Sequence, residues 1–148
     1  MKRSLSFLLL AIAFAGTALA QEKGGWRPAS KTAESITGDI IFGDDMITIN
    51  FAVFPLAEIR ALTASEALAV FDGAANGKGH LYRLVVPAAK KFQHKNTLCG
   101  SEETDWMATY VSGRTLEMAL FSGKEMPVMT VEAVNNSTSL CGIFTYAP

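Results

Sequence analysis

The chain has 148 residues, of which 49% are hydrophobic, and its 13 basic and 14 acidic side chains give a formal net charge of −1. This length and composition are typical of one folded domain with its own apolar core. The weak net charge argues against a nucleic-acid-binding protein, because such proteins usually carry a basic face.

Residues 1–20 have the pattern of a secretory signal peptide. Lys2-Arg3 gives a positive start, an apolar run follows from Leu5 to Ala15, and Ala18-Leu19-Ala20 has the small residues that signal peptidase recognises. The apolar run is shorter than the ~20 residues of a transmembrane helix. We therefore expect cleavage after Ala20, a soluble mature chain without a membrane span, and a location in the periplasm or outside the cell.

The mature chain is expected to consist of a flexible N-terminal lead-in, residues 21–34, and a single β domain, residues 35–148. The lead-in is polar and contains Gly24-Gly25 and Pro28, which favour a loop, although Trp26 is expected to dock onto the domain. The domain begins with a period-two alternation of apolar residues on both sides of Gly43-Asp44-Asp45. This pattern predicts a hairpin, whose inward-facing residues would be Ile36, Ile40, Phe42, Ile47, Ile49, Phe51 and Val53.

The next segments predict strands and one helix. Pro55 is expected to interrupt the pairing, so that residues 54–62 form a new short strand or an edge strand. Thr63 and Glu66 have the spacing of a capping box, which predicts a short helix from Ala64 to Asp72. The glycine-rich residues 73–79 predict a flexible turn, and residues 80–88 a strand with Tyr82, Leu84 and Val86 on one face.

The C-terminal third continues this pattern of short strands. Residues 106–111 and 115–121 alternate around Ser112-Gly113-Arg114 and predict a second hairpin, with Leu116, Met118 and Leu120 as its apolar face. Residues 128–134 predict a strand that places Met129, Val131 and Ala133 together, and residues 141–146 predict the last strand. The fold class is therefore all-β and mainly antiparallel, a small barrel or two-sheet sandwich of seven to eight strands with one short helix.

Cys99 and Cys141 are the only cysteines, and each lies within a Leu-Cys-Gly segment. In an exported protein two cysteines usually pair, because the compartment is oxidising. A disulfide between them would stabilise the domain by about 4 kcal/mol in the chain-entropy model.

Few residues suggest a catalytic, metal-binding or ligand-binding site. The acidic stretch Glu102, Glu103 and Asp105 beside Trp106 suits sugar binding or glycoside hydrolysis, although a charged run more often only faces water. His80 and His94 lie at loop or strand-edge positions, where we expect neither to act as a catalytic base. The chain lacks zinc-ligand spacing, and the loop after Asp72 lacks the side chains of a calcium or phosphate site. We therefore predict no catalytic residue, no metal and no cofactor.

Several segments, LYRLVVPAAKKF, NTLCG, WMATYV and LCGIFTY, resemble a family of small exported proteins of Gram-negative bacteria that has no assigned function. The resemblance covers most of the mature chain and is most specific in the two Leu-Cys-Gly segments. It implies export and a single domain, and it implies no catalytic residue.

Three functional hypotheses remain open. The first is a monomeric, non-enzymatic periplasmic binding or interaction module whose partner is an unknown protein or small ligand, with no nucleic acid. The second is a barrel that encloses a small apolar ligand, for which nine Phe and six Met residues offer a lining. The third, less favoured, is a cell-wall or sugar hydrolase that uses residues 102–105. An enzyme of another kind is not indicated.

Overall fold

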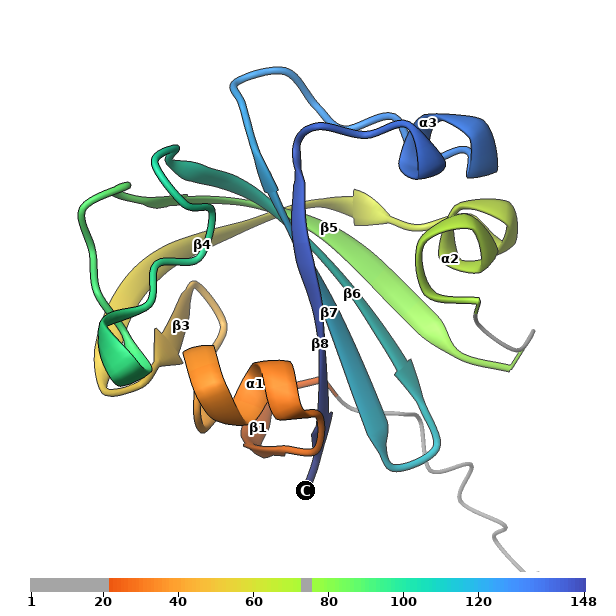
Figure 1. Cartoon of the computed structure of the whole chain (residues 1–148). Coiled ribbons are helices and arrows are strands. Elements are labelled where there is room, and N and C mark those ends of the chain that lie inside the picture. Colours follow the sequence, from red (N-terminus) through yellow and green to blue (C-terminus); the bar gives the residue numbers. More distant parts are fainter. Residues whose placement is uncertain (1–21, 73–75) are drawn as a thin grey trace, which may run out of the picture.

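The computed structural model describes residues 22–72 and 76–148 (Figure 1). The predicted signal peptide and part of the glycine-rich turn lie outside the described residues. Within these residues, eight strands form a closed antiparallel barrel in which each strand pairs with the next. The barrel closes where β1 (Gly24–Pro28) pairs with β8 (Leu140–Ala147). The prediction of a mainly antiparallel all-β fold is confirmed, in its barrel form.

Three short helices and a 3-10 turn connect the strands of the described chain, where the sequence predicted one helix. The strands between β1 and β8 are β2 (Ile40–Phe42), β3 (Met46–Ile49), β4 (Ala52–Ala61), β5 (Lys78–Val86), β6 (Thr104–Ser112) and β7 (Thr115–Ser122). The helical elements are α1 (Lys31–Ile36), α2 (Ala64–Phe71), the 3-10 turn η1 (Gln93–Lys95) and α3 (Val131–Asn135).

Alternate residues of the strands fill the interior of the barrel. Eight strands leave an interior just wide enough for side chains, and large apolar residues occupy it. The predicted inward faces of β5 and β7 are confirmed, since Leu84, Val86, Leu116, Met118 and Leu120 belong to this core. It also contains Ile40, Ile47, Ile49, Phe54, Leu56, Met107, Phe144 and Tyr146.

A second apolar cluster lies on the outside of the barrel, over β5, β6 and β7. The helices α2 and α3 pack against each other and cover this outer face, as Figure 1 shows on one side of the barrel. The covered residues are Leu81, Trp106, Ala108, Tyr110, Ala119 and Phe121, and the covering segments contribute Ala67, Val70, Phe71 and Met129. We call this surface the covered wall.

The capping box predicted from Thr63 and Glu66 is confirmed. The Thr63 hydroxyl accepts a hydrogen bond from the Glu66 N–H, and the Glu66 carboxylate accepts one from the Thr63 N–H. Glu66 also forms an ion pair with Arg60, in which Nη1 and Nη2 each lie 2.7 Å from a carboxylate oxygen. These contacts fix the start of α2, which lies over the covered wall.

The N-terminal segment differs from the expected flexible lead-in. Gly24 to Pro28 form β1, in which Trp26 is buried in the barrel core and pairs with Ile40. The α1 helix follows, and the hydroxyl of Ser30 caps its first turn. The expected docking of Trp26 is confirmed, and the strand formed around it completes the barrel.

Further expectations fail in the details of the strands. Phe51 and Val53, expected to face inward, are exposed, because Ile49 pairs with Ala52 across a two-residue turn and the inward alternation continues at Phe54 and Leu56. Ile36, expected in the first strand of the hairpin, is the last residue of α1. Residues 128–134 do not form a strand, because the hydroxyl of Thr130 accepts a hydrogen bond from the Ala133 N–H and starts α3. Pro55 does not end the pairing. It lies inside β4, opposite the first residue of β3, where the ladder ends and the missing N–H is tolerated.

Candidate functional site

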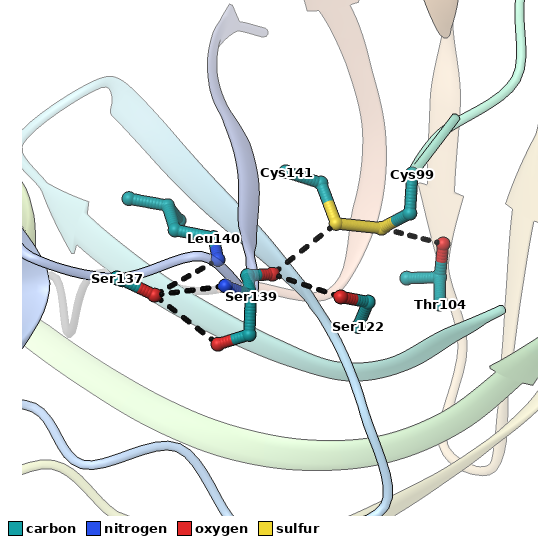
Figure 2. Close-up of a disulfide and its surroundings, with 7 residues drawn as sticks. All are labelled: Cys99, Thr104, Ser122, Ser137, Ser139, Leu140 and Cys141. Carbon is teal, nitrogen blue, oxygen red and sulfur yellow. Dashed lines mark hydrogen bonds between the residues drawn. A yellow bond between two sulfur atoms is a disulfide. The ribbon is translucent and has the colours of Figure 1, made fainter. Parts of the chain in front are cut away.

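The two Leu-Cys-Gly segments meet at one end of the barrel, where Cys99 and Cys141 form the predicted disulfide (Figure 2). Their Cα atoms are 5.0 Å apart, and the bond joins the loop before β6 to the start of β8. The Thr104 hydroxyl donates a hydrogen bond of 3.1 Å to Cys99 Sγ. Because both thiols are used, neither is a nucleophile or a metal ligand.

Serine side chains beside the disulfide fix the same strand end. Ser137 Oγ accepts hydrogen bonds from the N–H groups of Ser139 and Leu140, at 3.2 and 3.0 Å (Figure 2). The Ser139 carbonyl accepts from the N–H of Ser122 at 2.8 Å. The region that the cysteines mark in the sequence is therefore a structural anchor for β8.

The acidic stretch is divided between the barrel wall and the solvent. Asp105 is buried, and its Oδ1 lies 2.8 Å from Arg83 Nη2. The guanidinium of Arg83 also lies 4.7 Å from the ring centre of Trp106, whose indole N–H donates to the Gly123 carbonyl. The structure thus brings Asp105 and Trp106 together through Arg83 and leaves Glu102 and Glu103 exposed.

A polar cluster that sequence reasoning missed lies on the inner side of β5 and β6. The carboxylate of Glu22 accepts hydrogen bonds from the hydroxyls of Tyr82 and Thr109, and His80 Nδ1 lies 3.1 Å from the same carboxylate. Burial and the bond to Glu22 raise the pKa of Tyr82 above its ordinary value. We call these four residues the mouth cluster. Glu22, the β5 residues and Thr109 are far apart in the sequence. The only sequence signal for the cluster is that His80 and Tyr82, two positions apart on one strand, point to the same face.

The mouth cluster does not have the arrangement of a nucleophilic catalytic site. His80 Nδ1 faces Glu22, and His80 Nε2 lies 3.9 Å from the Glu58 carboxylate. Both ring nitrogens therefore face acids, and neither faces a hydroxyl nucleophile, as a general base would. His94, the other histidine, is exposed, with Nδ1 3.2 Å from the Ser35 carbonyl.

A groove of about 430 Å³ lies beside the mouth cluster, between the start of α2 and the start of β5. His80 belongs to the lining of this groove as well as to the cluster. Small apolar side chains, Ala61, Leu62 and Ala67, line part of it, and Lys78 adds a positive charge.

The outer face of β2, β3 and β4 carries exposed apolar side chains. Ile41, Thr48 and Val53 lie directly opposite one another on three neighbouring strands, so their side chains form one row on the outside. Met46 extends the row along β3. Ile41, Met46 and Val53 are each at least half exposed. Together with Phe51, these three residues form what we call the apolar face.

Phe51 lies at the tip of the hairpin that joins β3 to β4, and 96% of its surface is exposed. Ile49 pairs with Ala52, so Asn50 and Phe51 form a two-residue turn, with φ values of 45° and 65°. Two positive φ angles are typical of a type I′ turn, whose second position strongly favours glycine. An aromatic residue here is sterically unfavourable and gains no contact with the rest of the barrel.

A groove of about 700 Å³ borders the apolar face on the side of α1 and η1. Trp26, Ile41 and Phe51 provide apolar parts of its lining, and Arg27, Asp39 and Gln93 provide polar parts. Its volume lies in the range of ligand-binding clefts. The groove and the apolar face are continuous through Ile41 and Phe51.

Residues 22–72 and 76–148 hold no group of three or more His, Cys, Asp or Glu side chains that could bind a metal ion. No helix within them has the length and apolar character needed to span a membrane.

Comparison with known proteins adds no assignment. No family model, curated protein or solved structure matches the chain.

Proposed function

We propose that this protein is an exported, non-enzymatic binding module that docks a partner protein on its apolar face. The observation that carries this proposal is Phe51, an aromatic side chain that is 96% exposed in a turn position suited to glycine. Backbone strain at an exposed site supports a functional role, because folding alone would favour a less strained residue. Aromatic residues are also the most frequent energetic anchors of protein interfaces.

The shape of the surface supports a protein as the occupant. The exposed side chains of Met46 and Val53 continue the apolar face along β3 and β4, beyond the groove that Ile41 and Phe51 border. A small ligand in the groove would leave them uncovered, whereas a protein surface would cover groove and strands together. Apolar side chains clustered in this way on a barrel wall are typical of interaction sites.

The charges around the apolar face indicate the kind of partner. Asp39 and Asp45 immediately precede β2 and β3, are exposed, and take part in no salt bridge within the described residues. Acidic groups at this rim oppose binding to an anionic membrane surface. The groove lining also carries one exposed cation, Arg27, so the two carboxylates leave an excess of negative charge at the rim. They would complement a partner whose apolar patch is bordered by Lys or Arg side chains.

Site-specific photocrosslinking tests this proposal in cells that export the protein. Benzoylphenylalanine replaces Phe51 in one variant and, as a matched control, exposed Val128 in another. We expect an adduct with one other protein at position 51 and none at position 128. The absence of an adduct at 51, or the same adducts at both positions, would contradict the proposal. An adduct of twice the chain mass would instead indicate self-association.

The partner identified in this way then allows a quantitative test. Phe51→Ser and Ile41→Ser should each weaken its binding by about tenfold or more, as expected for anchors of an interface. Leu68→Ser removes a similarly exposed apolar side chain from α2 and should leave the affinity unchanged. Equal losses in all three variants would show that the apolar face has no special role.

A further inference from the structure

Three donors in the mouth cluster converge on one carboxylate. Tyr82 and His80 lie against one oxygen of Glu22, and Thr109 donates to the other oxygen. Because a carboxylate only accepts hydrogen bonds, His80 Nδ1 must carry the proton in this contact. His80 and Thr109 are direct partners in the β5–β6 ladder, so the barrel wall itself holds these donors in place.

The three donors require an acceptor, but that acceptor does not have to be the carboxylate of Glu22. The side chains of Tyr82 and Thr109 are buried, and a buried hydroxyl without a partner is unfavourable. Apart from Glu22, Thr109 Oγ1 has a contact of 3.4 Å with the His80 carbonyl. Any carboxylate placed between the three donors would satisfy them equally well.

The occupant of the site comes from a separate segment. Glu22 precedes β1, and its carbonyl accepts a hydrogen bond of 2.8 Å from the Trp26 indole N–H. Lys23, the next residue, pairs with exposed Asp44 on the surface. The segment 22–23 is thus held against the cluster by the contacts of Trp26 and Asp44. The donors, in contrast, belong to β5 and β6 and are fixed by the ladder of the barrel.

The groove of about 430 Å³ beside β5 is a separate space from the mouth cluster. Leu62, Ala67 and Tyr110 in its lining belong to the outer side of the barrel, whereas the mouth cluster lies on the inner side of β5 and β6. Glu58, 3.9 Å from His80 Nε2 and largely exposed, lies on the other side of the imidazole.

We propose that His80, Tyr82 and Thr109 form a carboxylate-binding site that Glu22 occupies within its own chain, and that a small free carboxylate displaces Glu22. The carboxylate of the ligand takes the position of the Glu22 carboxylate. Glu22 therefore acts as an internal competitor, and this site is independent of the apolar face.

Chemical rescue of Glu22→Ala tests the proposal. The variant should melt at a lower temperature than the wild type, because three donors lose their acceptor. Propionate and hexanoate should raise its melting temperature by about 2 °C or more at concentrations well above their dissociation constants. Propionamide and hexanamide, which carry no charge, should have no effect. In Glu22→Ala/Tyr82→Phe the rescue should be lost or reduced at least tenfold in apparent affinity.

Two results would overturn the proposal. One is the absence of rescue in a folded Glu22→Ala variant, and the other is an equal shift in wild type, Glu22→Ala and the double variant. If Glu22→Ala does not fold, the wild type provides the test through the Trp26 indole N–H resonance, since this group donates to the Glu22 carbonyl. Hexanoate should shift that resonance saturably in wild type and much less in Tyr82→Phe. An unchanged resonance at saturating hexanoate would contradict displacement.

Discussion

The outer surfaces of β5–β7 and of β2–β4 differ in what covers them. On the covered wall, Trp106, Tyr110 and Phe121 are buried under α2 and α3. On the apolar face, Ile41 and Val53 stand in a similar row across neighbouring strands and remain more than half exposed. Figure 1 shows the two helices on the side of the barrel away from β3.

Both surfaces carry apolar side chains on the outside of the barrel, but the helices of the described chain cover only one of them. Apolar side chains on the outside of a barrel gain free energy when a second layer removes them from water. The covered wall has that layer in its own sequence, between β4 and β5 and between β7 and β8. We infer that the apolar face receives its layer from another molecule, and the following predictions test the contrast.

The largest expected effect is on the covered wall. Phe121→Ala removes a side chain that is 1% exposed and packs in the cluster under the helices. It should lower the free energy of unfolding by about 3–5 kcal/mol, through lost burial and the cavity left behind. Urea denaturation followed by circular dichroism measures the change. A loss below about 1 kcal/mol would mean that the covered wall is not tightly packed, because buried Phe truncations rarely cost so little.

The disulfide should have the second-largest effect. Cys99→Ser/Cys141→Ser should lower the free energy of unfolding by about 2–4 kcal/mol, with a lower melting temperature. Because the bond holds the start of β8, directly after the segment that contains α3, the variant should also bind more of a dye for exposed apolar surface. Two reactive thiols in the native protein would contradict the bond.

A smaller, pH-dependent effect is expected where α2 begins. The Arg60 guanidinium is the main cause that lowers the pKa of Glu66 below its ordinary value. The folded state therefore favours the carboxylate, and this stabilisation is present at neutral pH and lost as the pH falls through the lowered pKa. Glu66→Gln keeps an oxygen for the capping box and removes the charge. It should be less stable than wild type by under about 1 kcal/mol at pH 7.

Urea denaturation of both proteins from pH 7 to pH 3 measures this dependence. The difference between wild type and Glu66→Gln should shrink as the carboxyl becomes protonated. A difference that stays constant down to pH 3 would show that the ion pair with Arg60 does not stabilise the helix start.

The smallest expected effect on stability belongs to the apolar face. Phe51→Gly relieves the positive φ at the hairpin tip, while glycine gives the unfolded chain more freedom. The net result should be a gain of about 0.5 kcal/mol in the free energy of unfolding. Thermal denaturation measures it, and the same variant should lose binding to the crosslinked partner. A marked destabilisation would show that Phe51 supports the fold.

Much of the barrel could be predicted from local patterns. The alternation of Leu116, Met118 and Leu120 places one strand and its inward face, because period two is a property of the strand itself. The capping box of Thr63 and Glu66 likewise depends on residues three positions apart. The pairing of Cys99 with Cys141 follows because the chain has no other cysteine.

The failures occur where distant contacts decide the local structure. Residues 24–28 look like a loop because Gly24-Gly25 and Pro28 dominate the pattern, and only burial of Trp26 in the finished barrel makes them a strand. Met129, Val131 and Ala133 alternate as a strand would, but the cap at Thr130 and the docking of Met129 on the covered wall favour a helix.

The candidate sites were still harder to predict. The mouth cluster joins Glu22 to residues on β5 and β6. The apolar face becomes visible only when the register of β2–β4 is known and no helix of residues 22–72 and 76–148 is seen to cover it. The composition of the acidic stretch suggested a surface site, yet Asp105 is buried and pairs with Arg83. Exposure depends on the whole fold, and residue type alone does not reveal it.

The pairing of β1 with β8 has a consequence for the order of assembly. During synthesis β1 is made first, but one of its two neighbouring strands is β8, which is made long afterwards. Contacts of such high sequence separation form late in folding, because a long loop must close first. A ribosome that stops before β8 would release a chain with two open sheet edges, which are templates for aggregation. Only a chain that includes its last strand can therefore close the barrel and pair both of these edges.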